Sequence, residues 1–97
     1  MLLDGFYEVL QQEQDKVVVK LGDASHPVFQ AHFPQNPILP GFVHLDIIED
    51  VFSLEIEVIK KAKYSSLVLP TQTITYIKEK NRIKVFHEDT EVASFLL

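Results

Sequence analysis

One segment limits the fold of this chain more than any other, because residues 22–41 hold four of its five prolines: Pro27, Pro34, Pro37 and Pro40. Proline fixes φ and removes a backbone donor, so neither a helix interior nor a central strand forms through such a run. The same segment carries apolar side chains at Val28, Phe29, Phe33, Ile38 and Leu39. We therefore expect a stiff loop packed against the rest of the protein, and long ordered loops often carry function.

A buried helix is predicted directly after this loop, from Phe42 to about Ser53. Apolar residues cover most of the circumference of this helix, so little of its surface should face water. Its polar residues follow the i, i+3, i+4, i+7 spacing of a single stripe, namely Asp46, Glu49, Asp50 and Ser53.

Strands are predicted on both sides of the loop and helix. Residues 6–10 and 16–21 are typical of a hairpin across the polar turn 11–15. Later strands joined by short turns, as in an antiparallel meander, are predicted at residues 55–63, 71–77, 82–87 and 92–97. A chain of 97 residues suits one domain, residues 1–97. We predict an α+β fold in which five or six antiparallel strands wrap around one helix.

Charge and residue types argue against several classes of protein. The net charge of −5 and a pI near 5.2 do not suit a protein that binds a nucleic-acid backbone, although they allow a phosphorylated small ligand. The absence of cysteine excludes a disulfide framework and a thiolate metal site. The N-terminus lacks a signal-peptide pattern, and no run reaches the roughly 18 apolar residues of a membrane span. We expect a cytoplasmic protein that binds neither nucleic acid nor membrane.

Three residues at the end of the proline loop have the chemistry of an active site. Gly41 lacks a Cβ and lies where the helix begins, so its N–H is one of the unpaired donors that favour a carbonyl oxygen or developing negative charge. His32, on the stiff loop, has an unperturbed pKa suited to proton transfer near neutral pH. Asp46, within the helix, supplies a second acid or base.

These residues carry a resemblance to a known family. The stretch His32-Phe33-Pro34-x-x-Pro37-x-x-Pro40-Gly41, followed by Asp46, resembles the active-site signature of the β-hydroxyacyl-acyl carrier protein dehydratases. That family has the hot-dog fold, in which a long helix lies inside a curled antiparallel sheet. Its catalytic histidine works with an aspartate or glutamate fourteen residues later, as His32 and Asp46 are spaced here. The match is dense over 15 to 20 residues and loose elsewhere.

The resemblance implies a reaction and an assembly. A 3-hydroxyacyl thioester on acyl carrier protein would lose water to give the trans-2-enoyl thioester, in fatty-acid or polyene-type lipid synthesis, without metal or organic cofactor. His32 would remove the α-proton, Asp46 would protonate or orient the leaving hydroxyl, and the Gly41 N–H would polarise the carbonyl. The site would lie between the subunits of a homodimer or a higher assembly, beside an apolar tunnel lined by Phe29, Phe33 and Phe42.

Several positions depart from the family pattern. Gln35 stands where the family usually has glycine, Asp50 stands where a glutamine is frequent, and Pro70-Thr71-Gln72 replaces a Pro-Gly-Asp turn. Carboxylates at Asp46 and Asp50 are spaced i, i+4, which predicts a raised pKa for one of them. These differences indicate a compact, specialised relative, similar to the small dehydratases of secondary polyene or lipid pathways.

Plainer interpretations stay open for each residue. His32 alone suits a structural or surface role, Asp46 a solvated helix face, and Gly41 a simple helix start. The basic cluster of Lys60, Lys61 and Lys63 either meets the acidic carrier protein or its phosphopantetheine phosphate, or only solubilises a strand end. We expect His26, His44 and His87 to be structural or exposed, because the spacing of His26, His32 and His44 matches no standard zinc pattern.

Two other functions also stay open. The same fold hosts acyl thioesterases, so the fold alone does not select dehydration. The altered positions Gln35 and Asp50 suit a non-catalytic subunit that only binds an acyl carrier.

Overall fold

Six strands and two helices make up the computed structural model, which describes residues 5–30 and 35–97. The hairpin strands β1 (Tyr7–Gln12) and β2 (Lys16–Leu21) come first, then the short helix α1 (Pro27–Gln30) and the main helix α2 (Val43–Phe52). The remaining strands are β3 (Lys61–Tyr64), β4 (Thr73–Glu79), β5 (Arg82–His87) and β6 (Thr90–Leu96). Neither helix in these ranges is long and apolar enough to cross a membrane.

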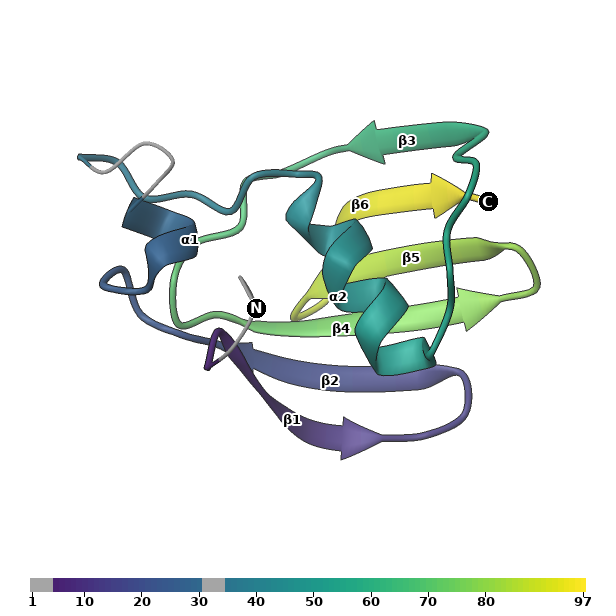
Figure 1. The fold of residues 1–97 in the computed structure, drawn as a ribbon, viewed down its shortest axis with the longest axis horizontal. Coiled ribbons are helices and arrows are strands. Elements are labelled where there is room, and N and C mark those ends of the chain that lie inside the picture. Colours follow the sequence, from purple (N-terminus) through teal and green to yellow (C-terminus); the bar gives the residue numbers. More distant parts are fainter. Residues whose placement is uncertain (1–4, 31–34) are drawn as a thin grey trace.

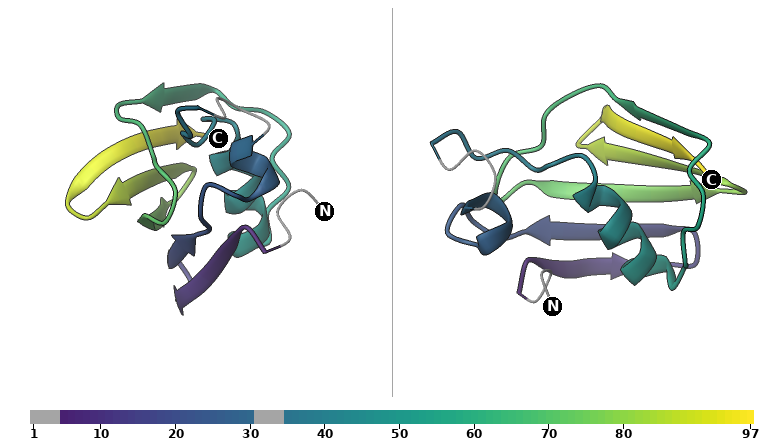
Figure 2. Two further views of the ribbon diagram at one scale, coloured as in Figure 1. Left: turned by 90° about the vertical axis from the view of Figure 1, so that its left-hand side faces the viewer. Right: turned by 45° about the horizontal axis from the view of Figure 1, so that its top comes forward.

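All six strands form one antiparallel sheet in the order β1-β2-β4-β5-β6-β3. The chain therefore leaves the hairpin, passes through both helices, and adds β3 at the far edge before the meander β4-β5-β6 fills the centre. Figure 1 shows α2 lying across the sheet, and Figure 2 shows the sheet curling around the helix. This confirms the predicted α+β architecture.

The core lies between α2 and the concave face of the sheet. Alternate residues of the central strands point inward, as the buried pairs Ile74 and Tyr76 in β4 and Ile83 and Val85 in β5 illustrate. From α2, the core receives Val43, His44, Ile47, Ile48 and Val51. Each large apolar side chain buried in this way stabilises the fold by about 1.5–3 kcal/mol.

The prediction differs from the structure most at two elements, while the ends of the other strands differ by up to two residues. The strand predicted at residues 55–63 is only Lys61–Tyr64, because the preceding residues cross from α2 to the sheet edge without a strand beside them. The helix α1 was not predicted, but Pro27 is its first residue, where a missing N–H costs nothing. The main helix agrees with the prediction to within one residue at each end.

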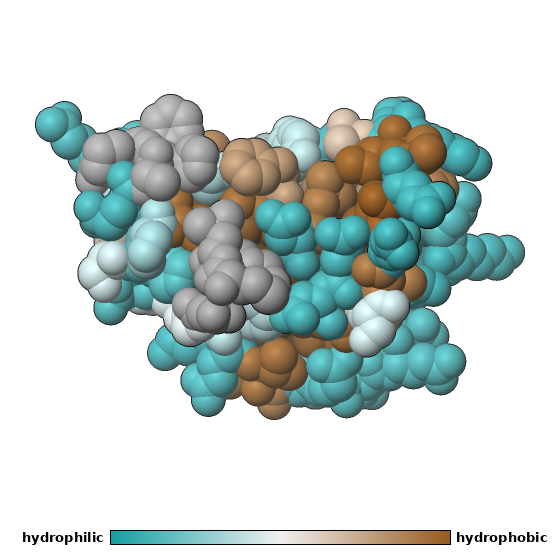
Figure 3. All heavy atoms as spheres, viewed as in Figure 1, coloured by the Kyte–Doolittle hydropathy of each residue, from teal (hydrophilic) through white to brown (hydrophobic). Residues whose placement is uncertain are grey.

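Large exposed apolar side chains gather around β3 and the segments next to it. They are Phe42, Val58, Ile59, Tyr64, Leu67 and Leu69. Two further ones, Val9 and Leu10, lie on β1 at the opposite edge. Figure 3 shows hydrophobic surface at the upper right of the face drawn there, where β3 and the segment leading to it lie. Exposed apolar surface concentrated at one sheet edge is typical of an interaction surface.

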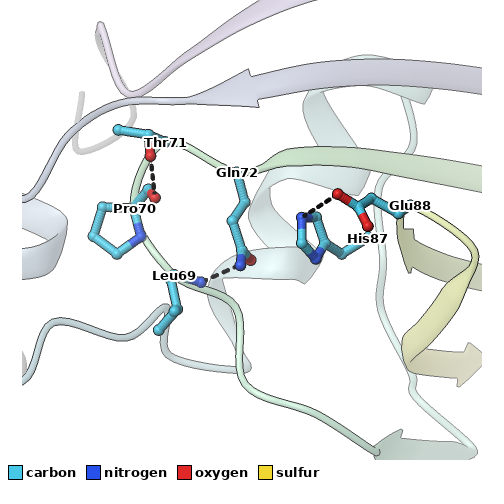
Figure 4. Close-up of polar contacts among 6 residues, drawn as sticks. All are labelled: Leu69, Pro70, Thr71, Gln72, His87 and Glu88. Atoms are coloured by element: carbon cyan, nitrogen blue, oxygen red, sulfur yellow. Dashed lines mark hydrogen bonds and ion pairs between the residues drawn. The ribbon is translucent and has the colours of Figure 1, made fainter.

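The turn before β4 contains a strained residue. Thr71 has a φ of 66°, in the left-handed region that suits glycine and is unfavourable for a β-branched side chain. Figure 4 shows how the turn is tied: the Thr71 hydroxyl donates to the Pro70 carbonyl at 2.6 Å, and the Leu69 N–H donates to Gln72 Oε1 at 3.0 Å. The Gln72 side chain thus closes a turn that lacks the family's glycine and aspartate.

His44 is a structural histidine in the core, as predicted. Its ring is 3% exposed, and its Nδ1 lies 2.9 Å from the hydroxyl oxygen of Tyr76. Burial lowers the pKa of His44 to about 4. Burial also raises the pKa of Tyr76, with a smaller contribution from Tyr7. Both groups are therefore neutral at pH 7.

We expect the buried His44 to make the protein less stable in mild acid. Because its pKa is lower in the folded than in the unfolded chain, the unfolded chain binds more protons below pH 6.5. The free energy of unfolding should fall by about 1–2 kcal/mol between pH 7.5 and pH 5. Urea titrations across this range measure it. The half-buried His87 is the matched control, and His87→Gln should keep the dependence while His44→Gln should lose it.

We also expect Thr71→Gly to stabilise the protein relative to Thr71→Ala. Both variants lose the threonine hydroxyl, but only glycine relieves the left-handed backbone. Allowing for the extra freedom of glycine in the unfolded chain, the difference in unfolding free energy should be about 0.5–1 kcal/mol. Thermal and urea unfolding of the two variants measure it, and an alanine variant as stable as the glycine variant would contradict it.

Candidate active site

The start of α2 is held in place from two sides. The Leu39 N–H donates to the Val68 carbonyl at 2.7 Å, which ties the end of the proline loop to the segment after β3. The Val43 N–H then donates to the Pro40 carbonyl at 3.0 Å and begins the first helical turn. Gly41 lies inside this turn. Within residues 5–30 and 35–97, its N–H has no hydrogen-bond acceptor.

Gly41 cannot be replaced by a larger residue without a change in its surroundings. A Cβ added to Gly41 would lie 2.5 Å from Cε1 and 2.8 Å from Cζ of Tyr64. The aromatic ring therefore rests directly on the glycine. Any side chain at position 41 would require the Tyr64 ring to move.

An apolar pocket of about 420 Å³ opens beside Gly41. One wall is the end of the proline loop and the start of α2, with Ile38, Pro40 and Phe42. The other wall is the end of β3 and the segment after it, with Tyr64 and Leu67. Gly41 lines this pocket among mostly apolar neighbours, where a hydrogen bond is stronger than in water.

Asp46 lies one helical turn beyond Phe42, on the face of α2 that points away from the core. Its side chain is partly buried, and among the described residues no donor contacts its carboxylate. Burial raises the pKa of Asp46, and the nearby Glu49 carboxylate raises it further. The carboxyl group thus keeps a proton more readily than an exposed aspartate does.

The other two acids of the stripe have structural roles. Glu49 Oε2 accepts a hydrogen bond of 2.8 Å from the Ile56 N–H, which anchors the segment that follows α2. Asp50 accepts a hydrogen bond from the Tyr7 hydroxyl of β1. The prediction that Asp50 raises the pKa of Asp46 is therefore wrong about the residue responsible. Asp50 binds Tyr7, and the carboxylate that raises the pKa of Asp46 is that of Glu49.

The remaining predicted site residues fall in different places. His32 and Phe33 lie outside the described residues, so the pairing of His32 with Asp46 stays a prediction. Phe42 is half-exposed and lines the pocket beside Gly41. Phe29 does not line that pocket, because it is fully buried and packs against Phe6 with ring centroids 5.4 Å apart.

Tyr64 is the pocket residue that the sequence prediction missed. The predicted strand covered residues 55–63 and ended one residue before it. A signal was present, since Lys61 and Lys63 alternate with Ala62 and Tyr64, and alternation places the aromatic ring on the opposite face from the lysines. Among residues 5–30 and 35–97, no three histidine or acidic side chains are grouped to hold a metal ion.

Comparisons with known proteins show the family to which this chain belongs. The model of the ApeI-like family, described as ApeI dehydratase, matches residues 9–94. A curated relative, the 3-hydroxyacyl-[acyl-carrier-protein] dehydratase FabZ of Thermoanaerobacter sp. (strain X514), is 32% identical over 63 residues. That alignment covers 65% of this chain and 44% of FabZ, so the match spans less than half of the relative's length.

Several solved structures share the fold of this chain although their sequence identity to it is low. The dehydratase heterocomplex ApeI:P from Xenorhabdus doucetiae has a TM-score of 0.69 at 16% identity, covering 92% of this chain and 93% of that one. Thioesterase superfamily member 2 from Mus musculus has a TM-score of 0.58 at 12% identity, covering 97% and 80%. These matches show the predicted hot-dog fold, which dehydratases and thioesterases share. The family match shows more than the fold: this chain belongs to the ApeI-like dehydratase family.

Proposed function

We propose that this chain removes water from a 3-hydroxyacyl thioester carried by an acyl carrier protein. The observation that carries the proposal is the Gly41 N–H, which has no acceptor among the described residues and lies beside an apolar pocket, with Asp46 one helical turn farther along α2. Membership of a dehydratase family supports the reaction class. The FabZ relative is named for the acyl-carrier-protein substrate.

The reaction needs one base, one acid and one carbonyl-binding donor. His32 takes the α-proton, and the electron pair of that C–H bond forms the double bond between Cα and Cβ. The Cβ–O bond breaks, and the hydroxyl leaves as water with a proton from Asp46. The Gly41 N–H binds the thioester oxygen while it carries enolate-like charge. Acid–base assistance contributes about 10²–10⁴-fold, and one such donor about 10²–10³-fold.

The surroundings of Asp46 support its role as the acid. A general acid must hold its proton near the working pH, and both burial and the Glu49 carboxylate raise the pKa of Asp46. Asp46 also faces away from the core, where a second subunit could bring a histidine to it.

We further propose that a second subunit covers the β3 edge. In the part of the chain that the structure describes, β3 pairs with β6 alone, and exposed apolar side chains surround it. A homodimer is the assembly implied by the resemblance. However, two β3 strands could pair antiparallel so that the outer faces of both sheets lie on the same side. Lys61 or Lys63 would then lie opposite a lysine of the other copy, and such like-charge pairs are unfavourable. An unlike partner avoids this repulsion, and the ApeI:P relative is described as a heterocomplex. A subunit role in such a complex is thus the second candidate function.

The outer face of the sheet supports an acidic carrier protein as partner. Lys61 and Lys63 of β3 and Arg82 and Lys84 of β5 line one groove of about 450 Å³, together with Glu79 and Glu91. Lys63 and Lys84 both pair with Ser94 across β6, so they lie in one row. Among the described residues, one of these four cations forms an ion pair: Lys84 Nζ lies 3.9 Å from Glu79 Oε1. A local excess of positive charge on a chain of net charge −5 suits an acidic protein surface.

We expect His32→Ala and Asp46→Asn each to lower kcat for 3-hydroxyacyl-carrier dehydration by about 10²–10⁴-fold. The absorbance of the conjugated enoyl thioester measures turnover, and released thiol measures thioesterase activity in the same mixture. Asp50→Asn is the matched control, because it makes the same carboxylate-to-amide change one helical turn away on a residue bound to Tyr7. It should keep most of the activity.

Two results would separate the candidate functions. Full activity in Asp46→Asn would remove the acid from the mechanism. An inactive chain with the 11.1 kDa mass of a monomer in light scattering would instead favour the subunit role.

We expect Lys61→Glu/Lys63→Glu to raise KM for a carrier-bound substrate by about tenfold or more at low salt and to leave KM for a pantetheine-bound substrate unchanged. The control is Lys16→Glu/Lys20→Glu on β2, which changes the net charge by the same amount but lies four strands away from β3 in the sheet. Steady-state kinetics at two salt concentrations measure both pairs. Equal effects from the two pairs would show that overall charge, and not this face, governs the carrier interaction.

A further inference from the structure

Tyr64 ends β3 and points to the inner face of the sheet. It pairs with the buried Ala93, and its ring meets Phe95 edge-on at 5.7 Å between centroids. The Phe95 contact fixes one side of the ring, and the ring rests on Gly41. The side chain is nevertheless 52% exposed, because it also forms a wall of the open pocket.

One edge of the Tyr64 ring, from Cδ1 to Cζ, lies close to Gly41. The Tyr64 atoms nearest to an added Gly41 Cβ are Cε1, Cζ and Cδ1, at 2.5, 2.8 and 3.0 Å. Because Cζ carries the hydroxyl, that oxygen lies within a few ångströms of the glycine. Gly41, whose N–H has no acceptor among the described residues, and the phenol of Tyr64 therefore line the same pocket.

The three tyrosines of this chain differ in what their hydroxyls do. The Tyr7 hydroxyl donates to Asp50, and the Tyr76 hydroxyl pairs with His44. In residues 5–30 and 35–97, the Tyr64 hydroxyl has no hydrogen-bond partner. A ring that served only to fill space above Gly41 would need no hydroxyl, whereas a donor held beside the pocket is suited to an incoming oxygen.

We propose that Tyr64 is a second carbonyl-binding residue, whose hydroxyl donates to the thioester oxygen together with the Gly41 N–H. This inference rests on the proposed function and deepens it. As the α-carbon loses its proton, negative charge grows on that oxygen, so a preorganised donor stabilises the transition state more than the ground state. The ring also limits where the carbonyl can lie, because it closes the space above Gly41.

The decisive variant is Tyr64→Phe, which keeps the ring and removes only the hydroxyl. We expect kcat for dehydration to fall about 10–100-fold with KM and melting temperature nearly unchanged, somewhat less than the loss of a fully buried oxyanion donor. The second readout is the infrared stretch of ¹³C-labelled butyryl-pantetheine, a saturated thioester that cannot lose water. Its carbonyl frequency should be higher when bound to Tyr64→Phe than when bound to the wild type, because one hydrogen bond is missing.

The infrared readout separates this inference from the proposed function. A wild-type protein that binds the saturated thioester but turns over no 3-hydroxyacyl substrate would overturn dehydration, and the carbonyl frequency would still test Tyr64. An unchanged frequency in Tyr64→Phe would overturn the inference whatever the activity.

A pair of variants checks the geometry itself. Gly41→Ala should destabilise the protein, since its Cβ meets the Tyr64 ring, and adding Tyr64→Ala should recover much of that loss. Failure of the second change to recover stability would show that the ring does not rest on Gly41 and would count against the inference.

Discussion

The burial of α2 in the concave face of the sheet is the constraint on which the rest of this structure depends. Five α2 residues enter the core, and the sheet supplies alternate side chains from its central strands to meet them. This packing determines which face of the helix remains available. It also brings the end of the proline loop against the segment after β3, where Leu39 binds Val68. The pocket beside Gly41 exists because these two segments meet there.

The outer face of the same helix shows how one polar stripe serves two purposes. Glu49 and Asp50 each bind another part of the chain, the segment after α2 and strand β1. Asp46 accepts no hydrogen bond among the described residues, and burial together with the Glu49 carboxylate raises the pKa of its carboxyl group. Acids that look equivalent on a helical wheel therefore differ in what they can do.

The edge strand β3 connects the proposed partner surface with the pocket. Its lysines face outward, and Tyr64 faces inward over Gly41. Because β3 is at the edge, both faces can be reached from one side of the molecule. A carrier protein held by the lysines would have its thioester arm a short distance from the pocket. Both the proposed carrier surface and the proposed subunit contact thus depend on this one edge.

The sequence by itself determined the elements whose pattern is local. The β-branched run in residues 16–21 and the polar turn before it specify the hairpin, the apolar circumference specifies α2, and proline explains the loop between them. It also placed Gly41 at the helix start and Asp46 on the helix. Only the tertiary structure decided the rest. The length of β3 depends on its pairing with β6. Asp50 binds the Tyr7 hydroxyl, and this contact with β1 is not visible in the helical pattern. The contact of Tyr64 with Gly41 joins residues far apart in the chain. The sequence pattern of a strand or helix predicts which face a side chain lies on, whereas tertiary packing decides which other residue it contacts there.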